Sequence, residues 1–377
     1  MKHKNVFLLL AFVPLFLMAQ TKDYNYYYTS GNDLLQKGNW KEALAMFDSA
    51  LLFQPKSSNA YIGRGGAKVY SDLFEEGLKD YDTAILYAEK KDKLSFYRKK
   101  ENALESEKLR NYYYFDQKLA IYNEAMAAFP DSASAYSDRS FLYYFKGKYE
   151  EALDDAKKSM KICHTVDGYS ILALAMAKTG DYSEKRIRSE YDKCIEEFPN
   201  DAASYFNRGV YFDGKRKSLM KNHPNSEQNK EMLDLQEKSL LDFSKAVSLN
   251  PNESIYQSFY CRLKVNSNKF SSDEILKDYQ SWIDHCPTSR QPYSERAMYY
   301  ASLKRWEDAI VDIDSSTKDI KSPLAILYKA NFKDLSGNYT PEDILKDLDK
   351  AAALKAEKGF VVFNDEMYKR LKAKYGK

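Results

Sequence analysis

Apolar residues recur along most of the chain at spacings of three and four residues, and this pattern begins again about every 34 residues. In one such period, Tyr61 and Gly65 mark a first helix, and Tyr81 and Ala84 mark a second helix. Each helix thereby gains one apolar stripe and one polar face. The sequence predicts an all-α protein of paired helices, in which a single pair cannot bury its apolar stripes without its neighbours.

Glycine and proline stand at regular places in this pattern. A positive φ is expected at the turn inside several pairs, at Gly38, Gly147, Gly180 and Gly337. Prolines are expected to end the second helix of several pairs, at Pro55, Pro130, Pro199, Pro251 and Pro287. These residues divide the chain into successive units.

Reading from Tyr24, we expect about nine helix–turn–helix units and a final capping helix. The expected units lie near residues 24–57, 58–92, 93–131, 132–165, 166–200, 201–252, 253–289, 290–321 and 322–358, and the capping helix in residues 359–377. The sixth unit carries a polar insertion at residues 214–233, with a turn expected at residues 223–226.

The first unit carries the most complete set of recurring positions. It reads Tyr27-x-x-Ser30-Gly31-x-x-Leu34, then Ala43-x-x-x-Phe47, Ala50 and Pro55. The same register returns at Tyr61-x-x-Arg64-Gly65 and at Tyr205-x-x-Arg208-Gly209-x-x-Phe212. In these residues the chain resembles the tetratricopeptide repeat family over residues 20–377, with departures in the third and seventh units and in the insertion. The resemblance implies a right-handed superhelical α-solenoid whose first helices line a concave groove, commonly occupied by a peptide or a helix of a partner protein.

Residues 1–19 are predicted to be a signal peptide rather than part of the fold. Two lysines precede an apolar stretch from Val6 to Leu17, and Ala19 is a small residue suited to cleavage. We expect an exported protein, periplasmic or secreted, that begins at Gln20; an uncleaved anchor is the alternative. No cysteine near the cut offers a site for lipid attachment. The leader resembles those of exported proteins of Gram-negative Bacteroidota.

The charge of the chain is balanced. Removal of the leader reduces the 58 basic residues to 56, against 55 acidic residues, and both signs are interspersed. A nucleic-acid-binding surface usually shows a basic stripe, and none stands out. We therefore expect no nucleic-acid partner, and no membrane span after the signal is removed.

The resemblance also implies which side chains face the groove. These are residues of the first helices that lie opposite the packing stripe: Tyr28, Asn32, Leu35, Asn59, Tyr70, Phe141, Tyr144, Phe145, Phe206, Val210, Gln257 and Met298. The aromatic residues among them are expected either to anchor an apolar peptide or to fill the core between units. The sequence leaves both interpretations open.

Two further features were weighed as binding groups. Some family members recognise a C-terminal carboxylate through Lys, Arg and Asn side chains, but only Asn32 stands in a matching place, beside Tyr28 and Gly63, so this function is not expected. Four arginines recur at one place in the repeat, and packing with ion pairing between helices is favoured for them over binding of acidic partners: Arg64, Arg139, Arg208 and Arg296.

Four cysteines would enter an oxidising compartment on export. Their spacing matches no redox or zinc motif. Cys163 and Cys194 are expected at similar levels of neighbouring units, so a disulfide between them is one prediction. Burial by packing is the other interpretation for Cys194.

No catalytic arrangement of residues is recognised. The histidines are scattered, and Gly63-Arg64-Gly65-Gly66 lies within a predicted helix and follows no strand. We expect no enzymatic activity, cofactor or metal site. A scaffold that binds a protein or peptide in the cell envelope is the preferred function. A self-associating structural component is the alternative, and a carbohydrate-binding or enzymatic solenoid is the third hypothesis.

Overall fold

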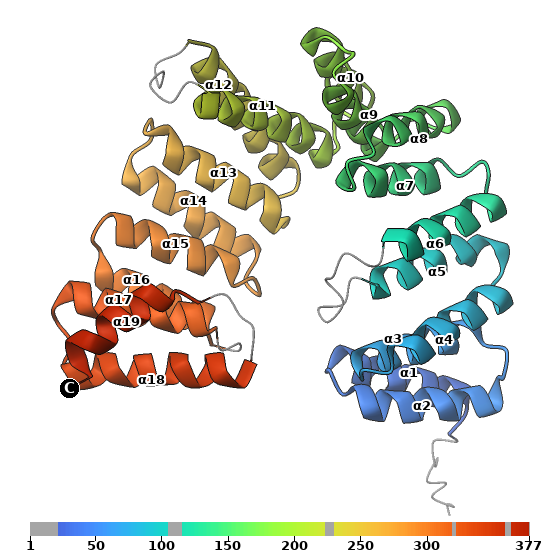
Figure 1. Ribbon diagram of the computed structural model, residues 1–377, viewed down its shortest axis with the longest axis horizontal. Coiled ribbons are helices and arrows are strands. Elements are labelled where there is room, and N and C mark those ends of the chain that lie inside the picture. Colours follow the sequence, from blue (N-terminus) through green and yellow to red (C-terminus); the bar gives the residue numbers. More distant parts are fainter. Residues whose placement is uncertain (1–21, 105–114, 223–229, 319–321, 359–362, 377) are drawn as a thin grey trace, which may run out of the picture. The chain divides into compact units, whose positions relative to one another are not determined.

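The computed structural model describes residues 22–104, 115–222, 230–318, 322–358 and 363–376, and their regular structure is entirely helical (Figure 1). The all-α fold predicted from the hydrophobic pattern is therefore confirmed. The chain divides into two compact units, Met1–Tyr182 and Ser183–Lys377. The expected signal peptide, residues 1–19, lies outside the described residues.

The described residues of the first unit form nine helices. They are α1 (Tyr24–Gln36), α2 (Trp40–Phe53), α3 (Ser58–Tyr70), α4 (Phe74–Tyr87), α5 (Lys90–Ala103), α6 (Phe115–Ala128), α7 (Ala133–Phe145), α8 (Tyr149–Ile162) and α9 (Val166–Thr179). The helices pair as hairpins, α1 with α2, α3 with α4, α5 with α6 and α7 with α8, and each hairpin packs on the next (Figure 1). Helix α9 packs on α7 and α8.

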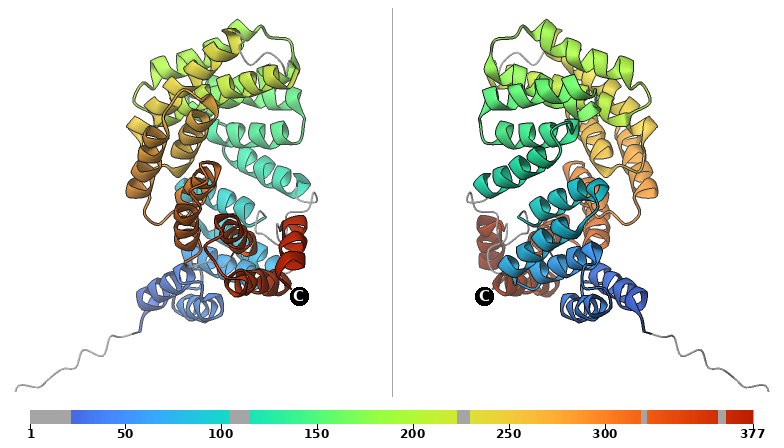
Figure 2. Two further views of the ribbon diagram at one scale, coloured as in Figure 1. Left: turned by 90° about the vertical axis from the view of Figure 1, so that its left-hand side faces the viewer. Right: turned by 90° about the vertical axis from the view of Figure 1, so that its right-hand side faces the viewer.

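The second unit contains ten helices in its described residues. They are α10 (Glu184–Glu197), α11 (Ala202–Asn222), α12 (Lys230–Leu249), α13 (Ser254–Ser267), α14 (Ser272–His285), α15 (Gln291–Ser302), α16 (Trp306–Ser316), α17 (Pro323–Ser336), α18 (Pro341–Lys358) and α19 (Asp365–Tyr375). Helices α11 to α18 form four hairpins, and α19 packs on the last of them, α17 and α18 (Figure 2).

The turns between paired helices share one backbone conformation. Each of the four expected glycines has a positive φ, between 73° and 81°. In three further hairpins the same place is taken by Asp72, Asn268 and Lys304, with φ values of 68°, 53° and 59°. A left-handed residue reverses the chain after the first helix, and glycine adopts this conformation without the penalty that a Cβ brings.

Close helix packing depends on small residues that face aromatic rings. The ring of Phe47 is fully buried, and a Cβ added at Gly31 or Gly63 would lie only 2.9 Å or 2.4 Å from it. The same relation recurs in the second unit, where a Cβ at Gly209 would lie 2.7 Å from Phe243. These glycines therefore set how closely α1 and α3 approach α2, and how closely α11 approaches α12.

The polar insertion is more helical than the sequence suggests. Helix α11 continues to Asn222 and α12 begins at Lys230, so much of residues 214–233 extends these two helices; the turn expected at residues 223–226 lies outside the described residues. Two groups anchor the extension. Arg216 is buried and donates to Asp213 at 2.7 Å, while Met232 is buried on the facing helix.

The expected fifth unit, residues 166–200, is divided between the two compact units. Helix α9 belongs to the first unit and α10 to the second. The side chain of Glu190 pairs within its own helix, with Arg186 at 2.6 Å and Lys193 at 3.2 Å. Leu172 stands in α9 at the place where four other first helices carry the recurring arginine.

Candidate protein-binding site

The four recurring arginines of the first helices all form the same network. Two nitrogens of each guanidinium donate to both oxygens of one aspartate on the second helix of the same hairpin, at 2.7–2.9 Å. The pairs are Arg64–Asp80, Arg139–Asp155, Arg208–Asp242 and Arg296–Asp312. Two parallel charge-assisted hydrogen bonds fix the orientation of both side chains.

The third nitrogen of each arginine reaches back to the preceding second helix. It donates to an oxygen that lies 16 residues earlier in the sequence, at 2.6–2.9 Å: Asp48, Asn123, Asp192 and Gln280. One side chain thus ties together three helices. We call each of these four arrangements an arginine lock.

The locks explain the arginines by helix packing, as the sequence favoured. The aspartates that receive the bidentate bonds are buried, and they were not singled out in the sequence. A usable signal was nevertheless present, because the aspartate follows its arginine by 16 residues in three hairpins; the long helices α11 and α12 widen this interval to 34 residues in the other. In two further hairpins an aspartate of the second helix pairs with a lysine of the first helix: Lys264 with Asp278 and Lys333 with Asp347.

Two of the residues expected to face a groove, Tyr28 and Phe206, are half-buried and pack against aromatic rings of the core. Tyr28 stacks on Tyr24, with ring centres 5.6 Å apart, and also contacts Phe47. Phe206 packs among the rings of Phe243 and Tyr256 at centre distances of 5.7 Å and 4.7 Å. These aromatics fill the space between hairpins, which was the second interpretation that the sequence left open.

Other residues of the expected set lie at the surface of the first helices. The exposed fraction is 60% for Tyr70 on α3, 81% for Phe145 on α7 and 45% for Met298 on α15. Tyr70 stacks on Trp40, with ring centres 4.6 Å apart. The half-buried side chains of the set are Asn32, Leu35, Phe141, Tyr144 and Val210; Asn59 is exposed, and Gln257 is buried.

Tyr70 and Phe145 occupy corresponding places in the repeat, since each is the last residue of its helix. Phe145 meets Tyr144 edge to face, at a centre distance of 5.7 Å. Tyr144 in turn contacts Tyr149, at 5.6 Å. At the end of α7, the exposed ring of Phe145 therefore packs on Tyr144, which in turn packs on Tyr149.

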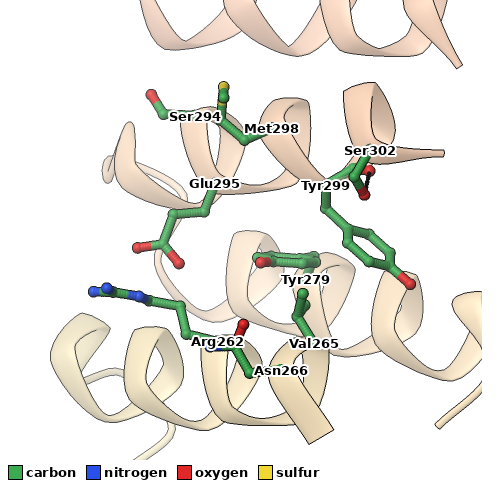
Figure 3. Close-up of a pocket in the computed structure, with 9 residues that line it drawn as sticks. All are labelled: Arg262, Val265, Asn266, Tyr279, Ser294, Glu295, Met298, Tyr299 and Ser302. Atoms are coloured by element: carbon green, nitrogen blue, oxygen red, sulfur yellow. Dashed lines mark hydrogen bonds between the residues drawn. The ribbon is translucent and has the colours of Figure 1, made fainter. Parts of the chain in front are cut away.

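A pocket of about 510 Å³ lies beside Met298, between α13 and α15 (Figure 3). Tyr279 of α14 and Tyr299 of α15 contribute apolar surface, with ring centres 6.0 Å apart. Val265 of α13 and Met298 extend this apolar lining. The size is within the range of pockets that hold small ligands or a few residues of a peptide.

Charged and polar groups gather on one side of this pocket. Figure 3 shows the carboxylate of Glu295, the guanidinium of Arg262 and the hydroxyl of Tyr279 on that side. Burial, with smaller effects of Cys261 and Glu295, raises the pKa of Tyr279 well above its usual value. Its hydroxyl therefore stays protonated and offers a neutral donor. Among these lining residues, the sequence had singled out only Met298 for binding.

Of the four cysteines, Cys163 is exposed and the other three are buried. Cys163 is exposed at the end of α8, whereas Cys194 is buried and its thiol contacts the hydroxyl of Ser204 at 3.4 Å. Cys163 belongs to the first compact unit and Cys194 to the second, and a disulfide between them stays a prediction. The other interpretation of Cys194, a small buried side chain that packs on the next helix, describes its surroundings.

Within the described residues, no helix has the length and apolar character needed to cross a bilayer. The described residues also contain no group of three or more His, Cys, Asp or Glu side chains arranged to hold a metal ion.

Comparison with known proteins places a tetratricopeptide repeat at residues 132–166, which comprise α7 and α8. No curated protein matches the sequence. Among solved structures, a monomeric IFIT1 mutant with m7Gppp-AAAA is 14% identical over 94% of this chain and 71% of that chain, with a TM-score of 0.51. Yeast Tom70 is 15% identical over 94% of this chain and 82% of its own, with a TM-score of 0.43.

A tetratricopeptide repeat protein from Parabacteroides merdae is 14% identical over 87% of this chain and 98% of its own, with a TM-score of 0.37. At such low identities, the likeness to solved structures concerns the fold alone. The matched repeat and the hairpins around it confirm the tetratricopeptide fold that the recurring residues indicated.

Proposed function

We propose that this protein, a solenoid of tetratricopeptide repeats, is a non-catalytic scaffold that binds a partner protein in the cell envelope through the first helices of its hairpins. One observation carries the proposal: Tyr70, Phe145 and Met298 are exposed apolar side chains on first helices. Aromatic residues and methionine are enriched at protein–protein interfaces relative to the rest of the protein surface.

The arginine locks support this function by holding the first helices rigidly. Arg139 lies on the same helix as Phe145, and its hydrogen bonds to Asp155 and Asn123 fix α7 against α8 and α6. A partner that binds a preorganised surface loses less conformational entropy of the scaffold on binding. Aromatic anchors on a rigid helix are well suited to the centre of an interface.

The proposed location rests on the leader sequence. A charged start, the apolar stretch from Val6 to Leu17 and Ala19 together favour export and cleavage before Gln20. Mass spectrometry of the protein from its native host should find Gln20 at the N-terminus. A mature chain that retains Met1 would contradict cleavage, and recovery from the cytosol would contradict the envelope location.

The interaction surface can be tested with two matched triple variants. The first, Tyr70→Ala/Phe145→Ala/Met298→Ala, removes exposed apolar side chains from first helices. The second, Leu52→Ala/Leu86→Ala/Val311→Ala, removes side chains from second helices with exposed fractions of 82%, 69% and 64%. Circular dichroism should show that both variants remain folded, because every replaced side chain is exposed.

Affinity purification after crosslinking in the native host should recover a partner with the wild type and the second variant. We expect its recovery to fall at least about tenfold with the first variant, since hot-spot side chains each contribute more than about 1 kcal/mol. Loss of the partner with the second variant alone would assign binding to the second helices and refute the proposed surface. Equal recovery with all three proteins would refute it as well.

A further inference from the structure

We infer that the pocket between α13 and α15 binds the backbone amide of an extended partner peptide, together with one apolar side chain of that peptide. The inference rests on the proposed function and names the chemistry of the partner at one site. The pocket has a volume of about 510 Å³ and lies wholly within the second compact unit. Its lining carries an acceptor, a donor and an apolar wall.

The acceptor is the carboxylate of Glu295. Its Oε1 atom receives hydrogen bonds from the hydroxyl of Ser258 at 2.7 Å and from the amide of Gln291 at 2.9 Å. These two donors hold the carboxylate in place. The Oε2 atom is shielded from solvent and has no hydrogen-bond partner among the described residues. A buried carboxylate oxygen that lacks a donor is energetically unfavourable, so a ligand that supplies an N–H group gains a strong interaction there.

The donor is the guanidinium of Arg262, on the facing helix α13. It lines the same pocket, and no hydrogen bond or ion pair of its side chain is found among the described residues. The side chain is exposed, so it can change its conformation when a ligand approaches Glu295 without any change in the helices. Figure 3 shows the guanidinium and the carboxylate on the same side of the pocket.

Charge complementarity selects the occupant. A lysine side chain would satisfy Glu295 but meet the positive charge of Arg262, and a carboxylate would satisfy Arg262 but meet the negative charge of Glu295. A peptide group avoids both conflicts, because its N–H donates to Glu295 while its C=O accepts from Arg262. Both bonds are charge-assisted, whereas the ligand itself remains neutral.

The apolar wall selects the neighbouring side chain of the peptide. Val265, Met298 and Tyr299 lie beside the polar groups and leave space for an aliphatic side chain. Met298 is 45% exposed, and its unbranched thioether adapts to the shape of a ligand. A leucine-sized group fits this surface better than a charged one, because burial of a charge without a partner is costly.

The test uses three tetrapeptides of alanine with acetylated and amidated ends, in which one central residue is leucine, lysine or glutamate. Binding is followed in the full-length protein by the ¹³C-methyl signals of its methionines. The methyl signal of Met298 reports on the pocket, and that of Met220, with an exposed fraction of 41%, serves as a control elsewhere in the second unit. We expect the leucine peptide to shift the Met298 signal saturably and to leave Met220 unchanged.

Substitutions then assign the polar contacts. Glu295→Gln and Arg262→Gln should each weaken binding of the leucine peptide at least about tenfold, since each removes the charge that strengthens a hydrogen bond to the peptide group. Arg290→Gln, at an exposed arginine outside the pocket lining, should leave binding unchanged. Tightest binding of the lysine or the glutamate peptide would overturn the inference, as would equal binding by all variants.

A Met298 signal that no peptide shifts would also overturn it. Partner capture that depends on the exposed side chains of the first helices, combined with no peptide binding here, would refute this inference and leave the proposed function standing. Peptide binding in this pocket without any captured partner would refute the proposed function and leave this inference standing.

Discussion

At the scale of single residues, the arginine locks are the main polar contribution to helix packing. Each buried aspartate is compensated by two parallel hydrogen bonds from one guanidinium, which also reaches the preceding second helix. An unpaired buried charge is strongly destabilising, whereas a fully paired one is tolerated. The locks therefore make the relative placement of three helices specific.

Asp155 and its neighbour Asp154 offer a matched test of one lock. Asp155 is buried and paired with Arg139, whereas Asp154 is exposed on the same helix. We expect Asp155→Ala to lower the free energy of unfolding by about 2 to 4 kcal/mol, because it leaves a largely covered guanidinium without its partner. Asp154→Ala should change it by less than about 0.5 kcal/mol. Urea denaturation followed by circular dichroism measures both values.

The double variant Arg139→Met/Asp155→Leu separates charge from packing. Replacement of both partners by apolar side chains removes the uncompensated charge, so we expect it to recover most of the loss caused by Asp155→Ala. Equal stability of Asp155→Ala and Asp154→Ala would show that the lock contributes nothing measurable.

Glycine spacing provides a second test at the residue scale. Gly63 and Gly66 lie on the same helix, but a Cβ at Gly63 would lie 2.4 Å from the buried Phe47 ring, and one at Gly66 would lie 3.6 Å from the hydroxyl of Tyr81. We expect Gly63→Ala to destabilise the protein by about 1 to 3 kcal/mol through overpacking. Gly66→Ala should stabilise it by about 0.5 to 1 kcal/mol, because alanine favours the helix. Thermal and urea denaturation measure both changes in stability. Changes of the same sign in the two variants would contradict this prediction.

At the scale of elements, side chains at the helix starts set where several hairpin helices begin. In α14, the backbone N–H of Ser271 donates to Glu274 at 2.8 Å, and its hydroxyl accepts from the backbone of Glu274 at 3.3 Å. Thr340 and Asp343 repeat this reciprocal arrangement before α18. These hydrogen bonds satisfy backbone N–H groups that a helix start otherwise leaves unpaired.

The capping carboxylate in α14 predicts a pH dependence. Hydrogen bonds from the side chain and backbone of Ser271 lower the pKa of Glu274 below its usual value. Glu274 is therefore protonated at a higher pH in the unfolded chain than in the folded chain. Its contribution to the free energy of unfolding is complete above about pH 4.3, the usual pKa of glutamate, and is lost as the pH falls through the lower pKa of the folded state. We expect the stability difference between wild type and Glu274→Gln to shrink from pH 7 to pH 3 in urea denaturation. A constant difference would contradict it, and Asp273→Asn serves as the control in the same helical turn.

At the scale of the whole molecule, the outer helices show polar surfaces. The exposed stripe of α1 consists of Asn25, Thr29, Asp33 and Gln36. On α19, Glu366 and Lys369 are exposed, while Leu371 is fully buried against the preceding hairpin. Polar outer helices end a stack of repeats and disfavour stacking against another copy.

These surfaces predict a monomer. Sedimentation equilibrium of the purified protein at micromolar concentrations should give the mass of a single chain, because no apolar stripe remains on α1 or α19 for end-to-end association. A larger mass would support the self-associating alternative. If Leu52→Asp then restored the monomer, the exposed ends of the second helices would be the contact, since Leu52 is 82% exposed.

The sequence by itself determined the all-α tetratricopeptide fold. Periodic apolar residues, turn glycines such as Gly38 and small residues such as Gly31 act locally or between adjacent helices, so their spacing carries the information. The sequence also favoured ion pairing for the recurring arginines, but it did not identify their buried aspartates.

Only the tertiary structure decided which aromatic side chains are buried and which are exposed. Tyr28 and Phe206 are half-buried against core rings, whereas Phe145 remains exposed, although all three were expected on the same face of the repeat. The pocket formed by Arg262 and Glu295 was likewise hidden in the sequence. Its residues come from helices of different hairpins. How close these residues lie depends on how the hairpins stack, and the periodicity within one helix carries no information about that stacking.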